Sequence, residues 1–166
     1  EKTNGLESAT YFEAIDWYKN LDKISTKVLV KEMGMTDAGY PLHLVLVSND
    51  GKFDAAQWHK QYKAVILINN GIHPGEPDGI DASMMLVRDI VNNKVKLPDN
   101  VALGFIPVYN IGGCLNRNSY SRANQEGPKE YGFRGNAQNL DLNRDFTKSD
   151  SKNAKSFDTI LTENVL

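Results

Sequence analysis

Apolar residues recur at helical spacing near both ends of the chain. In residues 7–21, the aromatic and aliphatic side chains from Tyr11 to Tyr18 fall on one face of a helix. Residues 150–164 show the same spacing around Phe157. The pattern therefore predicts one helix in each segment.

Two stretches with strand-like patterning lie between residues 26 and 50. The sequences TKVLVKEMGMT and PLHLVLVSND are separated by DAGY, which is typical of a turn. Two strands joined by so short a connection pair in antiparallel fashion. We therefore expect a β-hairpin, with His43 as a structural residue in its second strand.

A strand–helix–strand unit is predicted in the middle of the chain. The run KAVILIN, residues 63–69, is continuously apolar, which is typical of a strand buried on both faces. A helix over residues 78–93 and a second buried strand over residues 101–110 follow it. Because such a unit implies parallel pairing, we expect an α/β fold with a mixed, largely parallel sheet sandwiched by helices.

Length and charge exclude several classes of protein. The 166 residues have the size of one domain, and we treat residues 1–166 as one domain. The net charge of -2 gives no basis for binding nucleic acid or an anionic membrane surface. No apolar run approaches the roughly 18 residues that a membrane span needs. A single cysteine, Cys114, excludes a disulfide within the chain.

The first residue leaves localisation open. The chain begins at Glu1 rather than at a methionine. Either a targeting segment was removed, which favours a secreted or periplasmic protein, or the chain was trimmed.

The segment HPGEPDG directly follows the apolar strand of residues 63–69 and contains two candidate metal ligands. Ligands of open α/β sheets bind where strands end, and a neutral imidazole and a carboxylate are both good zinc ligands. His73 and Glu76 lie three residues apart in a turn stiffened by Pro74 and Pro77. The alternative is a structural turn with a surface histidine and a glutamate that caps the next helix.

A long polar stretch, residues 111–146, ends in a second group of candidates. Arg134, Asn143 and Arg144 are spaced closely enough to recognise a carboxylate together, because guanidinium groups bind carboxylates bidentately. The alternative is a solvated basic patch. Asp141 is either a turn residue or a carboxylate that accepts the second N–H of a metal-bound imidazole.

Three motifs in this order resemble the zinc carboxypeptidase family, the M14-type metallopeptidases. They are HPGEPDG, IPVYNIGG and RGNAQNLDLNRDF, and the resemblance covers roughly residues 25–166. It implies a zinc carboxypeptidase-like fold, and zinc as the cofactor with His73 and Glu76 as two of three ligands. It also implies a peptide substrate with a free C-terminal carboxylate.

The resemblance assigns roles to the polar stretch as well. Arg134 corresponds to the residue that polarises the scissile carbonyl, with Arg122 as a competitor for that role. Asn143 and Arg144 correspond to the pair that binds the terminal carboxylate of the substrate. Asp141 corresponds to the hydrogen-bond partner of His73.

The sequence departs from the family in two places. The family requires a third histidine ligand and a glutamate base later in the chain, whereas only Glu163 follows the last motif and no histidine does. His59 lies in a polar connection between predicted elements and is interpreted as a surface residue. The resemblance therefore implies the N-terminal half of a metallocarboxypeptidase catalytic domain, truncated and inactive by itself, with an uncovered sheet edge that favours self-association or pairing with the missing half.

Two other functions stay open at this point. One is hydrolysis of N-acyl amino acids by the related amidohydrolase branch. The other is a non-catalytic module that binds peptide carboxylates and has lost the metal, which the missing third ligand and base would also explain.

Overall fold

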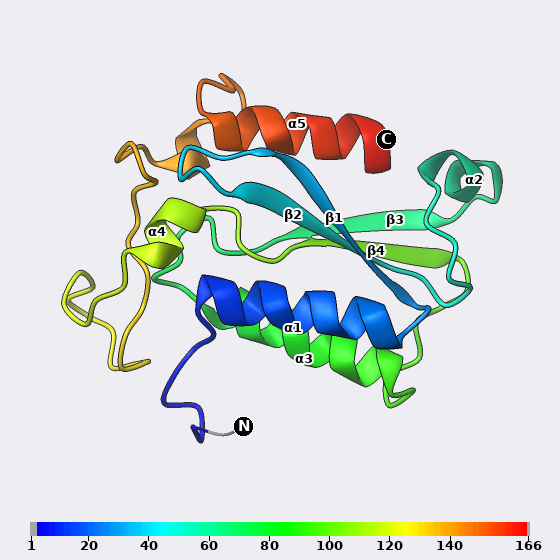
Figure 1. Ribbon diagram of the computed structural model, residues 1–166, viewed down its shortest axis with the longest axis horizontal. Coiled ribbons are helices and arrows are strands. Elements are labelled where there is room, and N and C mark those ends of the chain that lie inside the picture. Colours follow the sequence, from blue (N-terminus) through cyan, green and yellow to red (C-terminus); the bar gives the residue numbers. More distant parts are fainter. Residues whose placement is uncertain (1–2, 166) are drawn as a thin grey trace.

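The computed structural model describes residues 3–165 and shows a four-stranded sheet with helices on both faces (Figure 1). The strand order is β1-β2-β4-β3. The strands are β1 (Val28–Met35), β2 (Pro41–Val47), β3 (Ala64–Asn69) and β4 (Val101–Ile106). Helices α1 (Tyr11–Ile24) and α3 (Asp78–Val91) cover one face, and α5 (Lys152–Asn164) covers part of the other. This confirms the α/β class with a mixed sheet.

The pairing of the strands follows the two units that the sequence predicts. β1 and β2 form the expected antiparallel hairpin, with Val28 opposite Val47. β3 and β4 are parallel and are joined through α3, as expected for the strand–helix–strand unit. β2 and β4 are antiparallel. Within residues 3–165, parallel pairing is therefore limited to β3 and β4, and the expectation of a largely parallel sheet holds only for that unit.

The expectation that β3 is covered on both faces is wrong for the described residues. Ala64 is exposed and Ile66 keeps 48% of its surface accessible. β3 lies at the edge of the sheet, and Ile66 shares its face with Ile68, which packs in the layer of α1 and α3. In that layer α1 packs against β1, at the opposite edge of the sheet. A continuous apolar run therefore does not imply burial when the neighbouring elements lie over other strands.

Local signals set the helix boundaries. α1 begins after Thr10, whose hydroxyl oxygen accepts from the backbone N–H of Glu13 while the Glu13 carboxylate accepts from the N–H of Thr10. Ser151 caps α5 by accepting from the N–H of Ala154. Two short helices were not predicted, α2 (Ala55–Lys60) and α4 (Ile111–Leu115), because six and five residues are too few to show a period.

The core has one layer on each side of the sheet. Tyr18 of α1 and Val87 of α3 pack against Phe105 of β4 in one layer. Trp58 of α2 and Ile160 of α5 belong to the other. This packing holds the carboxyl ends of β3 and β4 together at one edge of the molecule. In the part of the chain that the structure describes, every helix is too short or too polar to cross a membrane.

Candidate functional site

The turn after β3 places His73 and Glu76 at the carboxyl edge of the sheet. The parallel pairing continues beyond the strands, since the N–H of Tyr109 donates to Asn70 O over 2.8 Å and the N–H of Asn110 donates to Gly71 O over 3.0 Å. The turn is then closed by the N–H of Glu76, which donates to His73 O over 2.8 Å. This hydrogen bond brings the two side chains to the same side of the turn.

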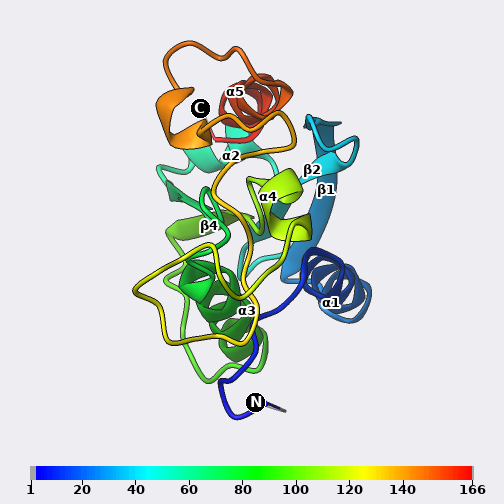
Figure 2. The same ribbon diagram turned by 90° about the vertical axis from the view of Figure 1, so that its left-hand side faces the viewer.

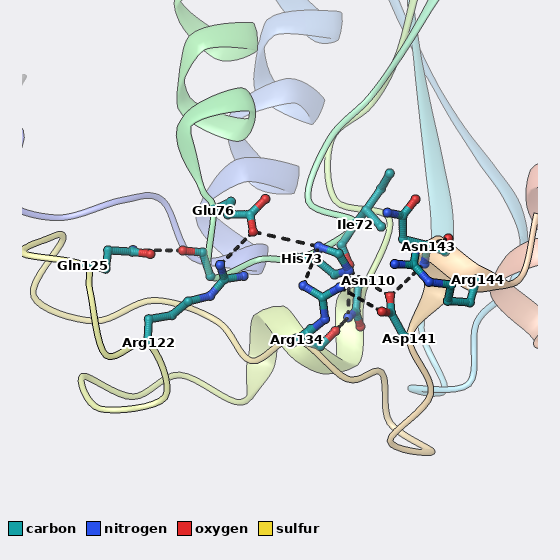
Figure 3. A network of polar contacts seen from close by, with 11 residues as sticks. Ile72, His73, Glu76, Asn110, Arg122, Gln125, Arg134, Asp141, Asn143 and Arg144 are labelled. Atoms are coloured by element: carbon teal, nitrogen blue, oxygen red, sulfur yellow. Dashed lines mark hydrogen bonds and ion pairs between the residues drawn. The ribbon is translucent and has the colours of Figure 1, made fainter.

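The two nitrogens of the His73 ring face different partners (Figure 3). Nε2 lies 2.8 Å from Asp141 Oδ1, as expected for a hydrogen-bonded carboxylate partner. Nδ1 faces the carboxylate of Glu76, with 3.9 Å between Nδ1 and Oε1. Because Nε2–H donates to Asp141, Nδ1 is the unprotonated nitrogen of the neutral ring and can accept a hydrogen bond or bind a metal.

Asp141 is the centre of the polar network. It caps the 3-10 helix η1 (Leu142–Arg144) by accepting from the N–H of Asn143 over 3.0 Å, and Oδ2 accepts from Arg134 Nη2 over 2.9 Å. The hydrogen bond from His73 is the main cause that lowers the pKa of Asp141, to about 2, against the opposing effect of partial burial. Asp141 is thus a permanently charged acceptor for His73 near neutral pH.

Both candidate arginines reach the histidine–glutamate pair, from different sides. Arg134 Nη1 lies 3.3 Å from His73 Nδ1. Arg122 Nη1 donates to Glu76 Oε1 over 2.7 Å. The loop that carries both arginines runs beside α3 and α4 before it reaches α5 (Figure 2). Each guanidinium group therefore contacts a different candidate ligand: Arg134 contacts His73 and Arg122 contacts Glu76.

Asn143 and Arg144 lie on the other side of His73 from Arg122 in the view of Figure 3. Asn143 lines a cavity of about 280 Å³ together with His73 and Glu76. The exposed Arg144 side chain donates from Nη1 to Asn143 O over 3.0 Å. Among residues 3–165 no carboxylate forms a salt bridge with Arg144, so its guanidinium is accessible to a ligand.

The donors present fit part of a zinc site. His73 Nδ1 and the Glu76 carboxylate converge on one cavity, and Asp141 holds the imidazole in the tautomer that metal binding requires. No group of three or more His, Cys, Asp or Glu side chains within residues 3–165 is arranged to hold a metal ion. The other histidines serve elsewhere, since His43 Nε2 lies 3.5 Å from Glu32 and His59 Nε2 lies 3.0 Å from Val165 O.

Asn110 is a structural member of the site that sequence reasoning did not single out. Its side chain is completely buried, and Oδ1 accepts from the N–H of Gly113 to cap α4. Its Nδ2 donates to Arg134 O over 2.9 Å. The available signal was an asparagine a few residues after a buried strand, since asparagine is a preferred residue at the start of a helix.

Comparison with known proteins supports the same family as the motifs. The model of the zinc carboxypeptidase family matches residues 14–163. No curated protein sequence matches the chain.

Solved structures of carboxypeptidases share the fold. A putative carboxypeptidase A from Shewanella denitrificans OS-217 superposes with a TM-score of 0.69 and 19% identity, over 92% of this chain and 36% of its own. A putative carboxypeptidase from Burkholderia mallei ATCC 23344 gives a TM-score of 0.68 and 20% identity, over 93% of this chain and 36% of its own. Carboxypeptidase A from Helicoverpa armigera gives a TM-score of 0.57 and 21% identity. This superposition covers 66% of this chain and 26% of the Helicoverpa chain. The chain thus spans about a third of the length of these structures.

Proposed function

Because this chain belongs to the zinc carboxypeptidase family, we propose that the protein hydrolyses the C-terminal peptide bond of peptides with zinc held by His73 and Glu76. One observation carries the proposal. His73 Nδ1 and Glu76 Oε1 face each other over 3.9 Å, while Asp141 occupies the other ring nitrogen at 2.8 Å. This is the arrangement in which a histidine and a carboxylate act together as ligands.

Zinc supplies Lewis acidity for the hydrolysis of a peptide bond when it is bound. His73 and Glu76 are two donors, and a catalytic zinc site usually has three protein ligands. We propose that the third ligand and the general base come from residues outside this chain, and that these 166 residues alone bind zinc weakly and are inactive.

Arg134 is suited to stabilise the negative charge that develops on the scissile carbonyl oxygen. Its guanidinium is held in place by Asp141 through Nη2 over 2.9 Å, and Nη1 lies beside the candidate metal ligand His73. A donor fixed before the reaction stabilises developing charge without reorganisation. Arg122 is bound to Glu76 instead, so the proposal assigns the oxyanion role to Arg134.

Asn143 and Arg144 are suited to bind the terminal carboxylate of the peptide. Asn143 lines the same cavity as His73 and Glu76, and the Arg144 guanidinium is exposed next to it. A charge-assisted contact to the terminal carboxylate would place the last peptide bond near the His73–Glu76 pair. This positioning would make the enzyme an exopeptidase rather than an endopeptidase.

The test is hydrolysis by the protein that contains this chain, measured in the presence of zinc. Three substrates separate the functions: a peptide with a free C-terminus, its C-terminal amide and an N-acyl amino acid. Release of the last residue from the free peptide alone would support the proposal. Preference for the N-acyl amino acid would identify the related amidohydrolase activity, and binding without hydrolysis of any of them would identify a carboxylate-binding module.

A further inference from the structure

Arg122 reaches Glu76 from a distant part of the chain. Its Nη1 donates to Glu76 Oε1 over 2.7 Å, across 46 positions of sequence. The Arg122 side chain is 23% exposed, whereas the Glu76 side chain is 56% exposed. The arginine is therefore the more firmly seated partner, and the glutamate is the group that gains order from the contact.

The turn between His73 and Glu76 is shaped to receive this arginine. A Cβ atom at Gly75 would lie 2.6 Å from Arg122 Nε and 2.9 Å from Gly132 O. Both distances are shorter than side-chain contacts permit, so only glycine leaves room for the guanidinium. The Gly75 carbonyl also accepts from Gln125 Nε2 over 2.9 Å, which ties the same loop to the turn.

The backbone of Arg122 is held as well. Its N–H donates to the hydroxyl of Tyr131 over 3.3 Å, and Tyr131 is 2% exposed. The backbone of Tyr131 in turn pairs with Asn118 in an antiparallel bridge. Arg122 thus projects from a loop with its own internal support, unlike an arginine on an open surface.

We propose that Arg122 is a positioning residue that holds the Glu76 carboxylate toward His73 Nδ1, in readiness for the metal. The inference rests on the proposed zinc-dependent function. Glu76 has three rotatable side-chain bonds, and its polar contacts within residues 3–165 are those to Arg122 and His73. Without the arginine, the carboxylate would be free to turn into solvent, and its ordering would have to accompany metal binding.

Arg134 does not perform this task. Its two terminal nitrogens contact other atoms than the Glu76 carboxylate, namely His73 Nδ1 at 3.3 Å and Asp141 Oδ2 at 2.9 Å. The two arginines are therefore expected to differ in effect. Loss of Arg122 should act on zinc affinity, whereas loss of Arg134 should act on catalysis.

The test is a zinc titration of the metal-free form of the protein that contains this chain. The NMR signals of the His73 ring report zinc binding during the titration. Arg122→Ala should raise the Kd for zinc by about 10- to 100-fold, the effect typical of losing a partner of a metal ligand. Gly75→Ala keeps the arginine but displaces it, and should raise the Kd in the same direction. Lys129→Ala is the matched control, because Lys129 lies in the same loop and pairs with the distant Glu7.

A double-mutant cycle shows whether Arg122 acts through Glu76. In a Glu76→Ala background, Arg122→Ala should cause no further loss of zinc affinity. An equal loss in both backgrounds, or a Kd for Arg122→Ala within twofold of wild type, would overturn the inference.

A second measurement does not depend on zinc. Side-chain relaxation in the metal-free protein should show greater mobility of Glu76 in Arg122→Ala than in wild type, and unchanged mobility would also overturn the inference. If wild type itself binds no zinc while Arg122→Ala still mobilises Glu76, the proposed function fails and the positioning of Glu76 by Arg122 stands.

Discussion

His73 and Asp141 lie 68 positions apart in the sequence, yet His73 Nε2 is 2.8 Å from Asp141 Oδ1. This contact joins the turn after β3 to the loop that precedes α5. It leaves His73 Nδ1 directed toward Glu76. The orientation of the candidate metal ligand is therefore determined by a residue from a distant part of the chain.

Replacing Asp141 by asparagine should weaken zinc binding by about 10- to 100-fold, because the ring of His73 loses a charged acceptor that holds its tautomer. The His73 ring signals during a zinc titration report the change. Asp150→Asn is a suitable control, since Asp150 pairs with Lys148 on the surface. Equal zinc affinity in wild type and Asp141→Asn would show that Asp141 is only a turn residue.

The stability of the protein should also depend on Asp141 in acid. Its pKa is lowered from 3.8 to about 2, chiefly by the hydrogen bond from His73. A carboxyl group whose pKa is lowered by folding stabilises the folded protein at pH values above its unfolded pKa. This contribution is lost as the pH falls through the pKa of the folded state. The difference in unfolding free energy between wild type and Asp141→Asn should therefore shrink between pH 4 and pH 2. Urea denaturation at several pH values measures it, and a constant difference would contradict the assignment.

Arg144→Ala should lower kcat/KM for peptides with a free C-terminus much more than for the corresponding amides. Loss of a charge-assisted contact corresponds to roughly 1.5–3 kcal/mol in kcat/KM, or about 10- to 100-fold. Lys148→Ala, which removes a nearby surface charge, serves as the control. The same loss on both substrates would remove Arg144 from carboxylate recognition.

Arg134→Ala should lower kcat by about 100- to 1,000-fold with little change in KM, as expected for a donor that acts on developing charge. The experiment is done at saturating zinc, with Arg122→Ala in parallel. Under these conditions Arg122→Ala should retain most of kcat. A larger loss of kcat in Arg122→Ala than in Arg134→Ala would transfer the oxyanion role to Arg122.

The edge strand β3 should promote self-association of the isolated 166-residue chain. Ile66 is 48% exposed on this strand, and exposed apolar edges favour contact with another chain. Sedimentation velocity should show a mass that rises with concentration. Ile66→Lys should reduce that rise, whereas Lys60→Ala, a change outside the sheet, should not. A monomer at all concentrations would contradict the prediction.

The sequence alone determined the features that depend on neighbouring residues. The hairpin, the strand–helix–strand unit and the three long helices follow from periodicity and turn residues, which act over a few positions. Thr10 and Glu13, for example, form their capping box within one helical turn. The types of candidate ligand, His73 and Glu76, were also apparent, because their spacing lies within a single turn of chain.

Only the tertiary structure decided the relationships that depend on the path of the polar loop. That loop has no period that reveals its course, so the sequence left Arg122 and Arg134 as competitors. The structure places one on Glu76 and the other on His73. The exposure of Ile66 was likewise undetermined, because an apolar strand is buried only where another element covers it. Local preferences are encoded over short distances, whereas packing decides which distant side chains meet.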